Sequence, residues 1–171
     1  MEVYFVPQTE GEPDSTTDAG HDAGLPLSER DRRYAQDVVG LLHGMGISLD
    51  RVLTSPLPAG RQTSQAIVTA WGDTPPPVTE CPQLSPGGDP LELTRCIRDS
   101  GGQAVALVGH EADLSRYAAR LIGGENALID LTDGAVAAVT FRGQLGDGQG
   151  VLIWVIPSGR VEKEPIPQPP V

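Results

Sequence analysis

The sequence predicts a three-layer α/β/α domain in which helices cover both faces of a mostly parallel sheet. Three observations support this fold class. Short apolar runs typical of buried strands alternate with segments of helical periodicity as far as about residue 122. Glycine and proline gather between these segments, which indicates tight connections. Near the end, two further apolar runs enclose an Asp-Gly turn, and this pattern predicts an antiparallel hairpin.

The first strand and the first helix have clear boundaries. Glu2–Val6 is an apolar run typical of a buried strand, and Pro7 ends it because proline has no backbone N–H. The polar stretch that follows has no apolar periodicity and predicts a long loop. Ser28 begins a helix, since Ser28 and Asp31 have the spacing of a capping box, and we expect this helix to end near Gly44.

The middle of the chain repeats the alternation of strand and helix. Arg51–Thr54 predicts a second strand, and Arg61–Trp71 predicts a second helix. Asp89-Pro90 supplies the residue types favoured at the N-cap and at the first position of a third helix. Ala104–Val108 is the clearest buried strand, and a helix from about Ala112 to Ile122 follows it.

The last part of the chain predicts the closing hairpin and a tail. Ala135–Phe141 and Val151–Ile156 are apolar runs, and the Gly-rich segment between them contains the Asp-Gly turn. We expect one domain over residues 1–162 and a loosely held Pro-rich C-terminal tail over residues 163–171. A chain of 171 residues can bury a core without disulfides or metals.

Composition excludes several kinds of partner. A net charge of −11 argues against nucleic acid and against an anionic membrane surface, because both would repel the chain. No apolar run approaches the roughly 18 residues that span a bilayer, and no signal peptide is evident, so we expect a cytoplasmic, bacterial-type protein. No metal and no cofactor are expected, because no pair of potential ligands has metal-binding spacing. Cys81 and Cys96 are interpreted as buried thiols, with a disulfide or redox pair as the alternative.

The candidate site lies beyond the carboxyl ends of the strands, where open α/β sheets bind ligands. Pro7–Glu10, Ser55–Arg61 and Gly109–Asp113 each follow a predicted strand. His110 is the most informative residue, because it lies where a strand ends and a helix begins, beside helix N–H groups that favour an anion. The alternative is a histidine that only bonds a neighbouring loop.

Other polar residues carry weaker hypotheses. His21 and His43 are interpreted as solvated or helix-capping side chains, and Ser55 is not placed in a nucleophile elbow. The acidic stretch of the long loop is interpreted as a solvated segment, or alternatively as the source of a proton donor over the site; its members are Glu10, Glu12, Asp14, Asp18 and Asp22.

Several short motifs follow one another in a distinctive order. Glu2–Val6 is followed by Leu25-Pro26-Leu27-Ser28, Arg51-Val52-Leu53-Thr54-Ser55-Pro56, Gln62-Thr63, Leu84-Ser85-Pro86-Gly87-Gly88-Asp89, Val108-Gly109-His110-Glu111, Gly134–Phe141 and a closing strand with Trp154. Together these motifs resemble the histidine phosphatase superfamily, with its phosphoglycerate mutase-like fold, and specifically the small SixA-type phosphohistidine phosphatases. The resemblance covers nearly the whole chain, and the length fits the branch without large cap insertions.

The resemblance implies a cationic phosphate site. In the family, a histidine in an Arg-His-Gly motif after the first strand attacks phosphorus. The arginine before it, an arginine after the second strand and a second histidine hold the phosphoryl oxygens, whose charge spreads in the transition state. Carried over to this chain, the resemblance gives seven positions for this site: Pro7, Gln8, Thr9, Ser55, Ala59, His110 and Glu111.

The chain departs from this motif at most of these positions. Pro7-Gln8-Thr9 stands in place of Arg-His-Gly, and the carboxamide of Gln8 cannot form a useful phospho-enzyme. Ala59 stands in place of the second arginine. Arg61 follows Ala59 by two residues, a shift that turns it by about 200° on a helix. His110 is the remnant of the catalytic set.

We therefore expect a SixA-like protein that has lost most of its phosphatase residues. In this interpretation it is a non-catalytic binding or regulatory pseudophosphatase whose partner is a protein or phosphoprotein. The alternative is an active phosphohistidine phosphatase with a rearranged site, in which His110 is the nucleophile and Arg61 or Arg116 is a compensating cation. An unrelated role on the same fold is the third hypothesis.

Overall fold

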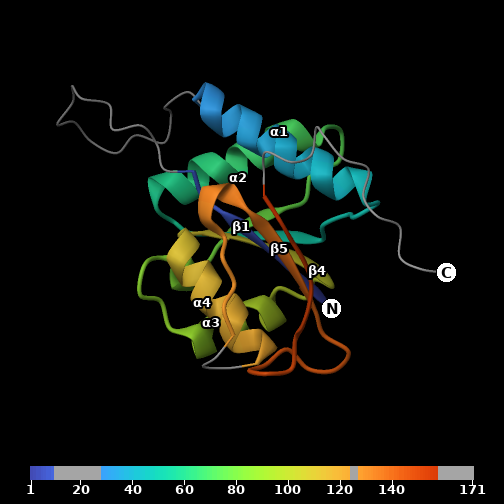
Figure 1. Ribbon diagram of the computed structural model, residues 1–171. Coiled ribbons are helices and arrows are strands. Elements are labelled where there is room, and N and C mark those ends of the chain that lie inside the picture. The colour runs from blue at the N-terminus through green and yellow to red at the C-terminus, as the bar shows by residue number, and fades with distance from the viewer. Residues whose placement is uncertain (10–27, 124–126, 158–171) are drawn as a thin grey trace.

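A computed structural model describes residues 1–9, 28–123 and 127–157 of the chain. These residues form a three-layer α/β/α structure, in which α1 and α2 lie on one face of the sheet and α3 and α4 on the other (Figure 1). The predicted fold class is therefore confirmed. The hypotheses on His21 and the acidic loop, and the predicted tail over residues 163–171, concern residues outside the described part.

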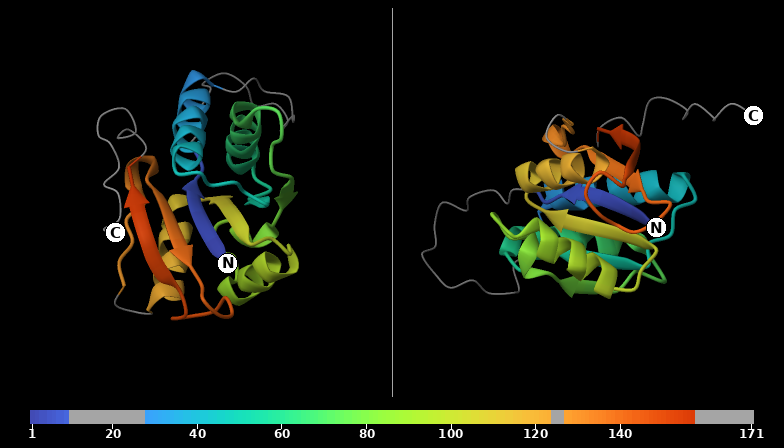
Figure 2. Two further views of the ribbon diagram at one scale, coloured as in Figure 1. Left: turned by 90° about the vertical axis from the view of Figure 1, so that its right-hand side faces the viewer. Right: turned by 90° about the horizontal axis from the view of Figure 1, so that it is seen from below.

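The sheet has six strands in the order β3-β2-β4-β1-β5-β6. The strands are β1 (Glu2–Pro7), β2 (Arg51–Thr54), β3 (Val78–Glu80), β4 (Ala104–Gly109), β5 (Val136–Thr140) and β6 (Val151–Ile156). The first four in spatial order pair in parallel, whereas β5 is antiparallel to β1 and to β6. The predicted hairpin is thus confirmed, and it places β6 at one edge of the sheet (Figure 2).

The helices are α1 (Glu29–Gly44), α2 (Pro58–Trp71), α3 (Pro90–Asp99) and α4 (Glu111–Ile122), with short 3₁₀ helices η1 (Pro82–Leu84) and η2 (Thr132–Gly134). Both predicted N-caps are confirmed. Ser28 and Asp31 form the capping box of α1, and the Asp89 side chain accepts hydrogen bonds from two backbone N–H groups of α3. No helix within the described residues is long and apolar enough to cross a membrane.

Three details differ from the sequence-based expectation. Helix α2 begins at Pro58 rather than Arg61, because proline suits the first helical position. Strand β1 continues through Pro7, which pairs with Gly109 of β4. Strand β3 is not predicted by the sequence: its three residues are exposed, so they give no apolar signal, and they form a strand through pairing with β2.

Alternation along β1 divides the core between the two faces of the sheet. Val3 and Phe5 pack into the cluster under α3 and α4, whereas Tyr4 and Val6 pack into the cluster under α1 and α2. Cys81 is buried in the first cluster, and its burial, together with the neighbouring Cys96 thiol, raises the pKa of Cys81 to about 12. Both cysteines are free thiols, and Cys81 is buried as the sequence-based interpretation expected, whereas Cys96 is only half-buried.

Gly60 sets the distance between α2 and the segment that leaves β2. A Cβ atom at this position would lie 2.8 Å from both the Cβ and the carbonyl oxygen of Ser55. We predict that Gly60→Ala lowers the free energy of unfolding by about 1–3 kcal/mol, because backbone must move to admit the methyl group.

The matched control is Gly40→Ala in α1, where an added Cβ would meet no atom within 4 Å. This change should raise the free energy of unfolding by roughly 0.5–1 kcal/mol, because alanine restricts the unfolded chain and favours the helix. Urea denaturation followed by circular dichroism measures both. Equal midpoints for the two variants would contradict the close packing at Gly60.

Candidate functional site

A cleft of about 860 Å³ lies at the carboxyl ends of β1 and β4. Its walls come from four places: Pro7–Thr9 at the end of β1, the first turns of α1, His110-Glu111 at the start of α4, and Thr132–Gly134 of η2. The parallel register that pairs Pro7 with Gly109 places the ends of these strands side by side. This is the position where open α/β sheets bind ligands.

Five of the residues singled out from the sequence line this cleft. Pro7, Gln8 and Thr9 come from the end of β1, and His110 and Glu111 come from the start of α4. The backbone N–H of Gln8 donates to the carbonyl oxygen of Gly109 at 2.8 Å, so the strand pairing extends to the residue beside His110. The structure therefore brings Gln8 and His110 to the same cleft.

Ser55 and Ala59 lie apart from the cleft lining. Ser55 is fully buried, and its hydroxyl oxygen accepts a hydrogen bond from the backbone N–H of Leu57 at 3.2 Å. Ala59 lies in the first turn of α2, where its carbonyl oxygen accepts a hydrogen bond from the Thr63 hydroxyl at 2.9 Å. Ser55 therefore caps the turn between β2 and α2.

The two arginines considered as compensating cations are engaged in ion pairs outside the cleft lining. Arg61 contacts Glu80 of β3 through Nε at 2.8 Å and through its terminal nitrogen at 3.1 Å. Arg116 contacts Asp113 within α4, and its side chain is 76% exposed. A phosphate in the cleft would have to draw each guanidinium away from a carboxylate.

His110 occupies the N-cap position of α4 but makes no capping hydrogen bond with its side chain. Its imidazole is 40% exposed, and Nδ1 lies 3.7 Å from the Asp113 carboxylate. Glu111 and Asp113 place two carboxylates in the first turn of α4, beside the positive end of the helix dipole. These carboxylates offset the dipole that the sequence analysis invoked in favour of an anion.

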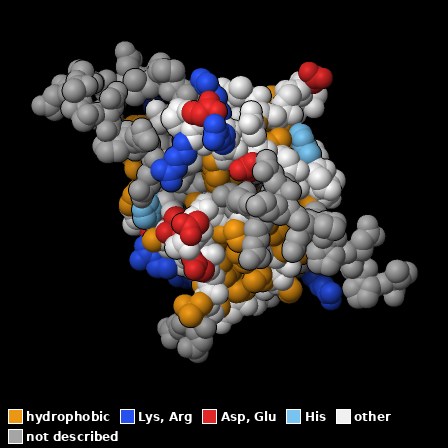
Figure 3. Space-filling model, turned by 45° about the horizontal axis from the view of Figure 1, so that its top comes forward, with side chains coloured by type: hydrophobic (Ala, Val, Ile, Leu, Met, Phe, Trp, Pro, Cys, Tyr) orange, Lys and Arg blue, Asp and Glu red, His pale blue; other side chains and the backbone are white. Residues whose placement is uncertain are grey.

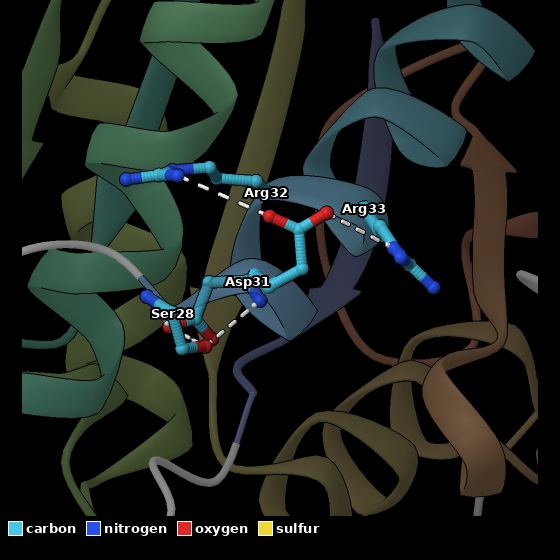
Figure 4. Close-up of polar contacts among 5 residues, drawn as sticks. Ser28, Asp31, Arg32 and Arg33 are labelled. Carbon is cyan, nitrogen blue, oxygen red and sulfur yellow. Dashed lines mark hydrogen bonds and ion pairs between the residues drawn. The ribbon is translucent and has the colours of Figure 1, made fainter.

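A buried hydrogen-bond cluster fixes the segment that follows Gln8. The Thr9 hydroxyl donates to the carboxylate of Asp31, and the Thr9 backbone N–H donates to the Thr63 hydroxyl at 2.9 Å. The same carboxylate accepts hydrogen bonds from the backbone N–H and the hydroxyl of Ser28 (Figure 4). Thr9, Asp31 and Thr63 are all at least 91% buried. The end of β1 is thus bonded to both α1 and α2.

Two guanidinium groups of α1 line the cleft, and the sequence alone did not point to either of them. Arg30 and Arg33 line the cleft, and Arg33 pairs with Glu29 through Nε at 3.2 Å (Figure 4). Glu29 also contacts Arg32, which points to the other side of the helix. The run Arg30-Asp31-Arg32-Arg33 is visible in the sequence, but only the fold shows which of its members face the strand ends.

Among the described residues, carboxylates outnumber guanidiniums in the cleft lining. The acidic side chains are Glu29, Asp37, Glu111 and Asp133, against Arg30 and Arg33. Figure 3 shows basic and acidic side chains side by side on the upper face rather than one basic patch. Asp133 has a φ of 55°, a left-handed conformation that costs a non-glycine residue on the order of 1 kcal/mol.

Two buried polar atoms of the cleft lining have no hydrogen-bond partner among the described residues. They are Oε1 of Gln8 and the hydroxyl oxygen of Tyr34. Tyr34 is 8% exposed, and its burial raises the pKa of its hydroxyl above the ordinary value. Both atoms are closed off from solvent, so each is a local cost to the stability of the fold rather than a contact offered to the cleft.

Thr9 supplies the first test of this geometry. Thr9→Val keeps the shape of the side chain but removes the donor to buried Asp31, so we predict a loss of about 1–3 kcal/mol in the free energy of unfolding. Thr69→Val on the exposed face of α2 is the control, with an expected change within roughly 0.5 kcal/mol. Urea denaturation measures both, and equal losses would show that the Thr9 hydroxyl does not hold Asp31.

Tyr34 supplies the second test. Tyr34→Phe removes a buried hydroxyl that has no partner, so the free energy of unfolding should stay constant or rise by about 1 kcal/mol. Tyr117→Phe should instead lower it by about 1 kcal/mol, because the Tyr117 hydroxyl bonds the Thr94 hydroxyl at 2.7 Å. Thermal denaturation of the two variants would contradict this assignment if Tyr34→Phe were the more destabilised.

Comparison of the sequence with known proteins gives one weak match. No family model matches the chain. An uncharacterized protein of Picosynechococcus sp. strain PCC 7002 is 29% identical over 127 residues, which are 73% of this chain and 75% of that protein.

Solved structures give a wider match. The protein histidine phosphatase SixA complexed with tungstate has a TM-score of 0.71 at 22% identity, covering 93% of this chain and 98% of that chain. The alpha-ribazole phosphatase of Shigella flexneri has a TM-score of 0.59 at 19% identity, covering 86% and 94%. A histidine-to-alanine mutant of Entamoeba histolytica phosphoserine phosphatase, in complex with phosphoserine, has a TM-score of 0.61 at 14% identity, covering 94% and 98%. The chain has the fold of the histidine phosphatases.

Proposed function

We propose that this protein is a pseudophosphatase: a binding or regulatory protein that uses the histidine phosphatase fold without hydrolysing phosphate. The observation that carries this proposal is the position of Gln8. It follows β1 directly, its backbone bonds Gly109, and its side chain lines the cleft beside His110. This is the position at which the resemblance places the histidine that attacks phosphorus.

A carboxamide at this position supports the loss of catalysis. The Gln8 side chain is a weak nucleophile, so it cannot carry a phosphoryl group through a two-step reaction. Pro7 and Ala59 stand where the resemblance places guanidinium groups, and neither can stabilise the charge that spreads over the phosphoryl oxygens. Each such loss typically costs orders of magnitude in rate.

The charges of the cleft support a protein partner rather than a phosphate monoester. Among the described residues, four carboxylates and two guanidiniums line it, so this lining lacks the excess of guanidiniums that would attract a dianion. The protein histidine phosphatase SixA, which shares this fold, acts on a protein, and this supports a polypeptide as the partner here. The Entamoeba mutant in complex with phosphoserine supports the alternative of a phosphorylated partner.

Turnover is the direct test of the proposal. Assayed with p-nitrophenyl phosphate and with a phosphohistidine protein, the purified chain should release phosphate no faster than buffer, because the nucleophile and two cations are missing. A SixA protein of the same fold is the positive control. Release above background that disappears in His110→Ala would overturn the proposal and favour the rearranged site with His110 as nucleophile.

Restoration tests whether the cleft is in the right place. The triple variant Pro7→Arg, Gln8→His, Ala59→Arg, with Thr9 retained for its bond to Asp31, should release phosphate at least about a hundredfold faster than the wild type. The control carries Pro7→Arg, Gln8→Asn, Ala59→Arg, which supplies the cations without the imidazole. If the triple variant neither binds phosphate nor exceeds this control, the cleft is not a phosphate site that these substitutions can repair.

A further inference from the structure

The two edges of the sheet differ in how they are protected from other chains. Strand β3 has only three residues, and its Glu80 forms an ion pair with Arg61 at 2.8 Å. Short length and charge are two means by which natural sheet edges avoid pairing with a second chain. Strand β6 has six residues, Val151–Ile156, and none of them is charged. The edge at β6 therefore lacks both of these protections.

Strand β6 also exposes large apolar side chains. Four of the eight exposed large hydrophobic residues in the described part of the chain lie on it, and they are 37% to 58% exposed: Val151, Leu152, Ile153 and Val155. The strand is the last in the sheet order, and Figure 2 shows it at the outer edge. Single exposed apolar residues are ordinary, but a contiguous group of them indicates an interaction surface.

The backbone of β6 is paired on one side only. Its ladder joins it to β5, and among the described residues no other backbone hydrogen bond involves Val151–Ile156. An edge strand presents its outward N–H and C=O groups as a template for a further strand. A strand laid along β6 would pair these groups and cover the apolar side chains at the same time.

A bulge in β6 decides which of its residues share a face of the sheet. The pairing with β5 shifts at Ile153, which is the extra residue. Leu152 pairs with Val139, and Val155 pairs with Ala137. Both of these β5 residues belong to the core cluster under α3 and α4. Leu152 and Val155 therefore lie on the same face, although they are three residues apart.

This arrangement makes β6 complementary to a second copy of itself. The same shift places Val151 and Ile156 together on the face covered by α1 and α2. A two-fold axis perpendicular to the sheet, through the centre of β6, creates an antiparallel pair of β6 strands and keeps each face with its like. Leu152 then lies opposite Val155 of the second copy, and Val151 lies opposite Ile156. Apolar side chains meet on both faces of the sheet.

We propose that β6 is a self-association surface, along which two copies of this chain pair in antiparallel fashion and join their sheets. The contact closes at two copies, because it is isologous and the opposite edge at β3 is short and charged. A strand of six residues spans only about 20 Å, so the interface is smaller than that of permanent dimers. We therefore expect a reversible dimer with a Kd on the order of 100 μM.

Analytical ultracentrifugation of the full chain tests this assignment. The average mass should rise toward that of a dimer as the concentration increases from about 10 μM to about 500 μM. Each copy carries a net charge of −11, so the two copies repel at long range, whereas β6 itself is uncharged. Raising NaCl from about 0.05 M to about 0.5 M should therefore tighten the dimer by about threefold or more, because salt screens this repulsion.

A matched pair of variants identifies the surface. Ile153→Lys places an ammonium group at the centre of β6 in both copies, so the dimer should weaken by about tenfold or more. Leu128→Lys is the control, because Leu128 is 97% exposed, lies outside β6 and changes the net charge by the same amount. It should leave the Kd unchanged. Matching circular dichroism spectra establish that both variants are folded.

Disulfide trapping tests the register. In a Cys96→Ser background, a mixture of Leu152→Cys chains with Val155→Cys chains should form more covalent dimer on mild oxidation than either variant alone. The reason is that only the mixture places one new thiol opposite the other. Equal yields from the mixture and from the separate variants would contradict this pairing of β6 with itself.

Two other results would overturn the inference. A chain that stays monomeric to about 500 μM at high salt does not pair through β6, and the edge is then left to residues 158–171 or to a different protein. Association that Ile153→Lys and Leu128→Lys weaken equally, or that added salt weakens, lies elsewhere on the surface. None of these results bears on hydrolysis, which the phosphatase assay decides independently.

Discussion

The parallel pairing of β1 with β4 is the contact on which the cleft depends. It aligns Pro7 with Gly109, so the first residue beyond β1 and the first residue beyond β4 share one space. The hydrogen bond from the Gln8 backbone to Gly109 extends that alignment by one residue. The fold thus brings two residues that are more than a hundred positions apart to the same cleft.

Helix α1 supplies the rest of the site, and the Thr9–Asp31 bond holds it there. Because the Asp31 carboxylate serves both the capping box and the end of β1, the start of the helix and the strand are placed together. Arg30, Arg33, Tyr34 and Asp37 then line the cleft as consequences of helical spacing. A change at Asp31 therefore alters the cleft wall as well as the helix cap.

Much of this architecture is visible in the sequence, for identifiable reasons. The capping box, the Asp89-Pro90 helix start and the buried run over Ala104–Val108 are local patterns, and the structure contains each of them. Strand β3 has no hydrophobic pattern in the sequence, because its residues are exposed and form a strand only by pairing with β2. The sequence likewise does not show that Arg30 and Tyr34 line the cleft, because the direction of their side chains relative to β1 is set by tertiary packing.

The Thr9–Asp31 bond also has a consequence for which residue can follow Gln8. The motif of the histidine phosphatases has glycine at the position of Thr9, and glycine offers no hydroxyl to a buried carboxylate. Replacing Thr9 alone by glycine would therefore withdraw one donor from the Asp31 carboxylate and lower the stability of the junction between β1 and α1. The bond thus joins the residue that follows Gln8 to the start of α1, so the local sequence there is constrained by the core as well as by the cleft.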